Sequence, residues 1–121
     1  MTRRETGVAG EKVALNYLKK HGYRIVETNY RNRFGEIDII ARHKNYFVFV
    51  EVRSKKSRDY GSPEESITPV KARHLRAAAR FYYQSHVGLP EDWRIDVIAV
   101  ELDEHDKPER INLIQNAIED D

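Results

Sequence analysis

Cysteine is absent from the chain, and methionine and tryptophan each occur only once among its 121 residues. Without cysteine the protein has no disulfide, no thiolate nucleophile and no cysteine-ligated zinc, which suits a reducing compartment. No apolar run approaches the ~20 residues that span a bilayer, and the N-terminus leads into no signal-peptide core. We therefore expect a cytoplasmic protein with no membrane partner.

Closely spaced histidines are also missing, because the five that occur are scattered singly along the chain. An imidazole-built metal site is therefore not expected, and any metal would be held by oxygen ligands. The length fits a single domain around one core. We expect this domain to comprise residues 1–121, with its core at about 7–115 and an acidic tail after it.

The formal net charge of +1 conceals a strong asymmetry along the chain. Residues 1–80 hold 18 lysines and arginines against 9 acids, whereas residues 81–121 hold 3 against 11. A basic surface of this kind fits a polyanion, in particular a nucleic acid. The alternative is ordinary solvated charge, which needs no partner in a chain with 34% charged residues.

The alternation of helix and strand patterns predicts an α/β domain with a central mixed sheet of four or five strands flanked by helices. Thr68 and Pro69 give the N-cap and the first position of the second helix. The predicted elements, in order, are a helix at 7–21, an extended segment at 23–30, strands at 35–41 and 47–53, a polar basic loop at 54–63, a helix at 68–85, and strands at 94–100 and near 110–114.

Two of the predicted strands carry a carboxylate within an apolar stretch, Asp38 in the first and Glu51 in the second. If these strands form a hairpin that turns at residues 44 and 45, counting back from the turn sets the two acids opposite one another. Their Cβ atoms would then lie roughly 4.5–5.5 Å apart on one face of the sheet. Like charges at that distance repel, and a divalent cation would remove the conflict. The alternative is a structural ion pair between each acid and Arg53, Arg33 or Arg94.

A third acid, Glu11, belongs to the stripe of the first predicted helix that also contains Ala14, Leu15 and Leu18. These positions are spaced as i, i+3, i+4 and i+7, so they share the face that turns toward the core. A carboxylate there is costly unless it is paired or coordinates an ion. The alternative is stabilisation by the helix dipole, because Glu11 lies near the helix N-terminus.

Basic residues gather in three segments: the bend before the hairpin, the polar loop after it, and one flank of the second helix. On that flank, Arg73, Arg76 and Arg80 follow one another three and four residues apart. A solvated face is the alternative reading of this flank, since long basic side chains commonly cover helix surfaces. The candidate nucleic-acid-binding residues are Arg31, Arg33, Lys55, Lys56, Arg58, Lys71, Arg73, Arg76 and Arg80.

Five blocks of residues follow one another along the chain: Gly10-Glu11, Gly35-Glu36-Ile37-Asp38, Phe49-Val50-Glu51-Val52-Arg53, Gly61-Ser62-Pro63-Glu64 with Lys71, and Arg94-Ile95-Asp96-Val97. Together they resemble the YraN family of uncharacterised bacterial proteins. That family is similar to the PD-(D/E)XK superfamily, whose restriction-endonuclease-like core also serves Holliday-junction resolvases. The resemblance implies a restriction-endonuclease-like core and hydrolysis of phosphodiester bonds that depends on Mg²⁺ or Mn²⁺.

The resemblance also assigns roles to individual residues. It implies that Asp38 and Glu51 bind the metal, that Glu11 joins them from the helix, and that the backbone carbonyl of Val52 supplies a further ligand. Hard carboxylate oxygens suit Mg²⁺, which lowers the pKa of a bound water and stabilises charge that develops on a phosphate.

The chain departs from the superfamily pattern at Arg53, where lysine is usual. Arginine stays protonated and cannot act as a base, although its fork binds phosphate well, so Arg53 would stabilise the transition-state anion. The missing amine would come from Lys55, nominally on the same strand face, or from Lys71 at the start of the second helix. The predicted catalytic residues are thus Asp38, Glu51, Arg53 and Lys55.

Two functions follow from these residues. The first is a metal-dependent endonuclease that acts on DNA in preference to RNA, including branched or structured forms. The second is a non-catalytic nucleic-acid-binding protein that has lost hydrolysis together with its lysine. Both functions predict a nucleic-acid partner, and both are compatible with a homodimer.

Overall fold

The computed structural model describes residues 2–57 and 61–119. Five strands form a mixed sheet with the spatial order β1-β2-β3-β4-β5. The element order and the mixed sheet with a helix on each face are those that the sequence predicts. The elements are α1 (Arg3–Lys20), β1 (Arg24–Asn32), β2 (Gly35–His43), β3 (Tyr46–Lys56), the 3-10 helix η1 (Pro63–Ser66), α2 (Pro69–Gln84), β4 (Asp92–Leu102) and β5 (Pro108–Ile114).

The strand directions explain where the crossover lies. β1, β2 and β3 form an antiparallel meander, β4 runs parallel to β3, and β5 returns antiparallel to β4. The parallel pair needs a long connection, and η1 and α2 provide it. β3 pairs with β4 as far as Lys56, so residues 54–56 belong to a strand and not to the loop predicted at 54–63. The prediction was wrong there because the polar side chains of this segment lack the apolar pattern of a strand, although its backbone stays paired with β4.

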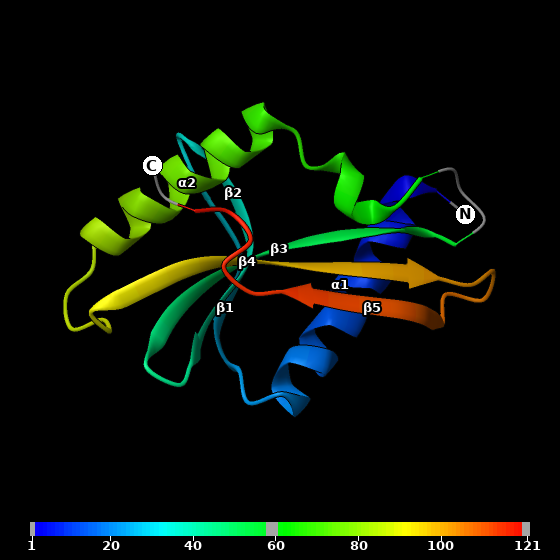
Figure 1. Cartoon of the computed structure of the whole chain (residues 1–121), viewed down its shortest axis with the longest axis horizontal. Coiled ribbons are helices and arrows are strands. Elements are labelled where there is room, and N and C mark those ends of the chain that lie inside the picture. Colours follow the sequence, from blue (N-terminus) through cyan, green and yellow to red (C-terminus); the bar gives the residue numbers. More distant parts are fainter. Residues whose placement is uncertain (1, 58–60, 120–121) are drawn as a thin grey trace.

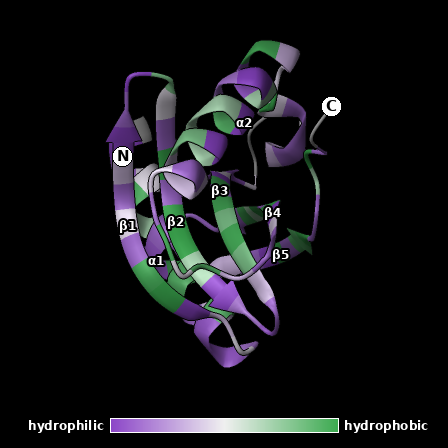
Figure 2. Cartoon of the chain, turned by 90° about the vertical axis from the view of Figure 1, so that its left-hand side faces the viewer, coloured by the Kyte–Doolittle hydropathy of each residue, from purple (hydrophilic) through white to green (hydrophobic). Residues whose placement is uncertain are grey.

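The two helices cover opposite faces of the sheet, with α2 over one face and α1 beneath the other (Figure 1). One core packs Leu75 of α2 against Phe49 of β3, and the other packs Leu18 of α1 against Val50 of the same strand. Figure 2 shows the hydrophobic residues gathered along the central strands beneath α2. Within the described residues, neither helix has both the length and the apolar character of a membrane-spanning helix.

Side-chain caps fix the start of each helix. α1 begins four residues earlier than predicted, because the hydroxyl of Thr2 accepts a 3.2 Å hydrogen bond from the N–H of Glu5. α2 begins where the sequence predicts, with Thr68 accepting a 3.1 Å bond from the N–H of Lys71. The second cap places Lys71 in the first turn of α2, and the amine of Lys71 lies 3.5 Å from Oε2 of Glu51 on β3.

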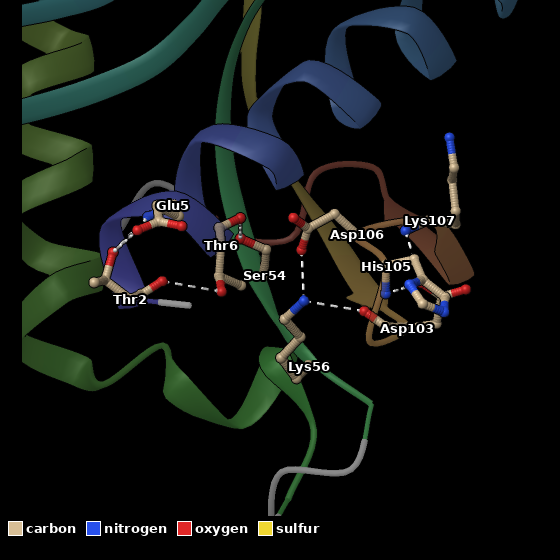
Figure 3. Close-up of polar contacts among 9 residues, drawn as sticks. All are labelled: Thr2, Glu5, Thr6, Ser54, Lys56, Asp103, His105, Asp106 and Lys107. Carbon is tan, nitrogen blue, oxygen red and sulfur yellow. Dashed lines mark hydrogen bonds and ion pairs between the residues drawn. The ribbon is translucent and has the colours of Figure 1, made fainter.

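α1 packs closely against β3 at Gly10. A Cβ atom on Gly10 would lie 2.4 Å from the Cβ of Ser54, so any larger residue would push the helix away from the strand. The hydroxyl of Ser54 lies 3.5 Å from the carbonyl oxygen of Thr6, to which it donates (Figure 3). This contact holds the neighbouring Glu11 close to the sheet.

Candidate functional site

The hairpin of β2 and β3 has the predicted register. It turns at residues 44 and 45, and its pairing continues as far as Ile39 and Val50. The pairing ends one step before Asp38 and Glu51, where β2 leaves β3 while β3 continues beside β4. We call the point between Asp38 and Glu51, where β2 and β3 separate, the strand fork.

Asp38 occupies the space that opens as β2 diverges. Its Oδ2 accepts a 2.8 Å hydrogen bond from the backbone N–H of Val52, which no longer has a β2 carbonyl beside it. The side chain is half-buried. This contact fixes one carboxylate oxygen of Asp38 against β3, next to Glu51.

Glu51 is only 2% exposed and has a second acid beside it. Burial, then the negative charge of Asp38 and a hydrogen bond between the two carboxyl groups, raises the pKa of Glu51 to about 7. Lys71 and Arg53 oppose that rise. The Nη1 of Arg53 donates to Oε2 of Glu51 at 3.1 Å, and the Nζ of Lys71 lies 3.5 Å from the same oxygen. Both acids are therefore ionised together at low cost only if further positive charge is supplied.

Glu11 approaches the strand fork from α1. Burial raises the pKa of Glu11, the charge of Asp38 raises it further, and a hydrogen bond with Asn29 lowers it. Glu11 and Glu51 thus both interact electrostatically with Asp38, although the three carboxylates are not grouped as a metal site among the described residues.

Asn29 is a site residue that sequence reasoning missed. It lies in the edge strand β1 with a φ of 55°, a left-handed conformation that asparagine tolerates better than most residues. Together with Asp38 it lines a small pocket of about 110 Å³ between β1 and β2. The available signal was an asparagine inside a strand segment, where this residue is disfavoured.

The carboxylate oxygens at the strand fork are potential ligands for a divalent cation. Among residues 2–57 and 61–119, no three His, Asp or Glu side chains are grouped as a complete metal site. Mg²⁺ is commonly held by one or two carboxylates and keeps several waters, so it needs no third protein acid. The paired oxygens of Asp38 and Glu51, with the unfavourable charge between them, fit Mg²⁺ or Mn²⁺.

The basic side chains predicted for catalysis lie in two places. Arg53 lies at the strand fork, where its Nε donates to the hydroxyl of Ser66 at 2.7 Å, and Lys71 lies there with it. Lys55 instead donates to the carbonyl of Gly61. Of the two lysines considered as the missing amine, the structure therefore brings Lys71 to Glu51.

Two of the predicted nucleic-acid-binding arginines lie at the turn between β1 and β2. Arg31 forms an exposed ion pair with Glu36. The guanidinium of Arg33 lies over the ring of Phe34 at 4.9 Å and over the ring of Phe81 at 5.5 Å. This turn therefore combines positive charge with aromatic rings.

The arginines predicted on α2 lie along the outer part of that helix. Arg73 and Arg80 are exposed and Arg76 is half-buried. Arg58, which was predicted to bind nucleic acid from the loop, lies outside the described residues.

Lys56 has an intramolecular role. It is 8% exposed, and its Nζ lies 2.5 Å from Oδ1 of Asp106 and 3.1 Å from the carbonyl oxygen of Asp103 (Figure 3). Because side chains alternate along a strand, Lys56 points to the α1 face, opposite to Glu51 and Arg53. We therefore leave Lys56 out of the proposed nucleic-acid surface.

A second acid and arginine lie two residues apart on β4. Asp96 is fully buried and accepts hydrogen bonds from Nε of Arg94 at 2.8 Å, from the hydroxyl of Tyr23 at 2.8 Å and from the N–H of Asn116 at 2.9 Å. Its polar contacts are all made within the protein. Asp96 is therefore a structural residue of the sheet.

Comparison with known proteins places the chain in a family. Residues 10–100 match the model of Uncharacterised protein family UPF0102. A UPF0102 protein of Dehalococcoides mccartyi is 47% identical over 116 residues, which cover 96% of this chain and 94% of that protein. Similar proteins of Syntrophus aciditrophicus and Persephonella marina are 47% and 48% identical, over 94% and 78% of this chain and 88% and 81% of their own lengths. The chain therefore belongs to the UPF0102 family, which is the YraN family that its residue blocks resemble.

Proposed function

We propose that this protein is a metal-dependent nuclease that hydrolyses phosphodiester bonds of DNA at the strand fork. The observation that carries the proposal is the close approach of Asp38 to buried Glu51, where burial first and then the charge of Asp38 raise the pKa of Glu51 to about 7. Perturbed acids of this kind cluster at functional sites, and a bound divalent cation removes the repulsion between them.

In this proposal each residue at the fork has a distinct role. Asp38 and Glu51 would hold the ion, Glu11 would support them from α1, and the carbonyl of Val52 would be a further ligand. A bound Mg²⁺ or Mn²⁺ supplies an activated water and stabilises negative charge on the phosphate. Arg53 would bind a phosphate oxygen through its guanidinium.

Lys71 is the proposed substitute for the lysine that Arg53 replaces. Its amine lies 3.5 Å from Oε2 of Glu51 and is one-third exposed, so it contacts the acids and also faces solvent. A lysine in this position can orient a water or donate to a phosphate, which arginine at position 53 does with less freedom. Relocation from β3 to the first turn of α2 keeps an amine beside the acids.

A second function is favoured by one specific contact. Oε2 of Glu51 is already within reach of two cations, Arg53 and Lys71, which partly neutralise it without a metal. A protein that had lost hydrolysis would retain such internal pairing together with a basic surface. The second candidate is therefore a nucleic-acid-binding protein without catalytic activity.

Incubation with DNA separates the two functions. Purified protein is mixed with single-stranded, duplex and junction DNA in Mg²⁺ or Mn²⁺, beside an Asp38→Asn control that keeps an acceptor for Val52. Metal-dependent cleavage by the parent and not by the variant supports the nuclease. Binding that salt weakens, without cleavage by either protein, supports the second function. Failure to bind any DNA at low salt contradicts both.

A further inference from the structure

We propose that Phe34, Phe81 and Arg33 form a stacking platform for an unpaired base beside the strand fork. This inference rests on the proposed action on DNA and deepens it, because it narrows the substrate to DNA with unpaired nucleotides near the cleaved bond. The three residues of the stacking platform come from the β1–β2 turn and from α2.

The stacking platform is a compact group of planar side chains at the surface. The rings of Phe34 and Phe81 lie 5.5 Å apart at an angle of 52°, and each residue is 38% exposed. The guanidinium of Arg33 lies over both rings, at 4.9 Å and 5.5 Å. Aromatic faces and guanidinium planes are the surfaces on which proteins stack unpaired bases.

Charge complementarity points to a polyanion as the occupant. An apolar protein partner would be met by an uncharged patch, whereas here a guanidinium covers both rings. Exposed Arg80 is the chain neighbour of Phe81, and exposed Arg73 lies on the same helix. A base on the rings and its phosphate beside the arginines would satisfy both features.

The turn that carries the stacking platform is held rigidly against α2. The side chain of Asn32 donates to the carbonyl of Ala78 at 3.2 Å and accepts from the N–H of Phe34 at 2.9 Å. A Cβ atom on Gly35 would lie 3.4 Å from the carbonyl oxygen of His74, which shows how closely the turn approaches the helix. A preorganised platform costs little ordering entropy when a base binds.

The position of the stacking platform relates it to the acids. Asp38 lies on β2, four residues after the turn residue Phe34, a span of at most about 13 Å at the usual rise of a strand. A strand of DNA whose phosphate lies at Asp38 and Glu51 can therefore place a base a few nucleotides away on the rings. A regular duplex keeps its bases stacked inside and cannot use this surface.

Binding to matched single-stranded and duplex DNA tests the stacking platform. A single strand that contains 2-aminopurine, and the blunt duplex of the same sequence, are titrated without added metal. The variant is Phe34→Leu with Phe81→Leu, which keeps apolar bulk and removes both rings. Tyr46→Leu is the control, because Tyr46 is 39% exposed and has an arginine over its ring, yet lies at the opposite end of β2.

We expect the double leucine variant to bind the single strand about tenfold more weakly than the parent. Its fold-loss of affinity for the duplex should be at least fivefold smaller than its fold-loss for the single strand. Quenching of 2-aminopurine should disappear in this variant and return in the Phe34→Tyr, Phe81→Tyr protein. Thermal unfolding checks that each variant is folded. Equal losses for both DNAs, or none, would overturn the stacking platform.

The binding titration and the DNA cleavage assay together separate this inference from the proposed nuclease. If the parent cleaves DNA and the leucine variant shows no selective loss of single-strand affinity, the stacking platform is contradicted and the nuclease is supported. If the selective loss is seen but no protein cleaves, the stacking platform stands and the nuclease falls. Absence of binding to either DNA overturns both.

Discussion

Two neighbouring strands each carry an acid and an arginine two residues apart, and their surroundings differ sharply. On β4, Asp96 and Arg94 pair at 2.8 Å, and other donors complete the coordination of the acid. On β3, Glu51 pairs with Arg53 at 3.1 Å but also faces Asp38, a second acid. The same residue types thus give a fully hydrogen-bonded structural pair on β4 and a site of unfavourable negative charge on β3. At the β3 site, an added cation would stabilise the neighbouring carboxylates of Glu51 and Asp38.

The β4 pair is part of a closed polar network. Nη2 of Arg94 contacts the hydroxyl of Tyr23 at 3.1 Å and Nδ1 of His43 at 3.0 Å. Burial, and then the charge of Arg94, lowers the pKa of His43, which keeps the ring neutral and able to accept. Among the described residues, every fully buried side-chain nitrogen or oxygen has a hydrogen-bond partner. Asp96 lies beside Val50 in the β3–β4 register, so a network of this kind rigidifies the sheet on the face opposite to Glu51.

Loss of Asp96 should give the largest change in stability. Asp96→Ala leaves Arg94 buried without its carboxylate, and breaking a buried pair in this way typically costs about 3–5 kcal/mol. Urea denaturation of parent and variant measures the difference in the free energy of unfolding. A difference below ~1 kcal/mol would remove the contrast between the two strands.

Glu51→Gln should stabilise the protein, with an effect that depends on pH. The pKa of Glu51 is about 7 in the folded protein, against an ordinary value of 4.5. Between these values the unfolded chain loses the proton and the folded protein keeps it, so ionisation favours the unfolded state as pH rises. The variant should therefore gain stability over the parent from about pH 4.5 to about pH 7, by up to ~3 kcal/mol, and then stay constant.

Urea denaturation of both proteins across this pH range measures that gain. Asp38→Asn is the matched control, because it removes the other member of the pair and should lower the pKa of Glu51. A difference between Glu51→Gln and parent that is the same at every pH would mean that Glu51 is not in conflict with Asp38.

Removal of the Lys71 amine should slow cleavage by about a hundredfold, the lower range for loss of a positioned acid or base. Lys71→Met is compared with Lys55→Met in the Mg²⁺ cleavage assay, because Lys71 lies 3.5 Å from Glu51 whereas Lys55 donates to the carbonyl of Gly61. We expect the Lys55 variant to lose far less. If both variants cleave as fast as the parent, the proposal that Lys71 substitutes for the usual lysine is wrong.

The smallest effect is expected at Glu64, an acid of η1 whose arginine partner is exposed. Arg110 and Asn112 lower the pKa of Glu64 to about 2. The unfolded chain takes up a proton first as pH falls, so this pair stabilises the fold above about pH 4.5 and not below pH 2. Because solvent screens the pair, Glu64→Gln should cost only about 1 kcal/mol at neutral pH in the same denaturation assay. A cost as large as that of Asp96→Ala would contradict the role given to burial.

The sequence was sufficient for those parts of the site that depend on local geometry. The hairpin turn at residues 44 and 45 fixes the register, which sets Asp38 and Glu51 one step beyond the last paired residues, Ile39 and Val50. The helical stripe likewise placed Glu11 on the face of α1 that approaches the sheet. Both follow from the regular spacing of side chains along strands and helices.

Other parts depend on packing between distant segments and could not be predicted. Whether Lys55 or Lys71 reaches Glu51 is decided by how α2 crosses the sheet, and the sequence left both open. The burial of Lys56 follows from the extension of β3 beside β4, which polar residues concealed. The left-handed conformation of Asn29 has only a weak signal in the sequence.

Anomalous diffraction from crystals soaked in Mn²⁺ tests the central claim most directly, because it needs neither substrate nor activity. We predict an anomalous peak at the strand fork, bonded to carboxylate oxygens of Asp38 and Glu51, and its loss in Asp38→Asn crystals. A parent crystal with no peak between these two acids, at Mn²⁺ concentrations that fill carboxylate sites elsewhere, would contradict the metal-dependent nuclease.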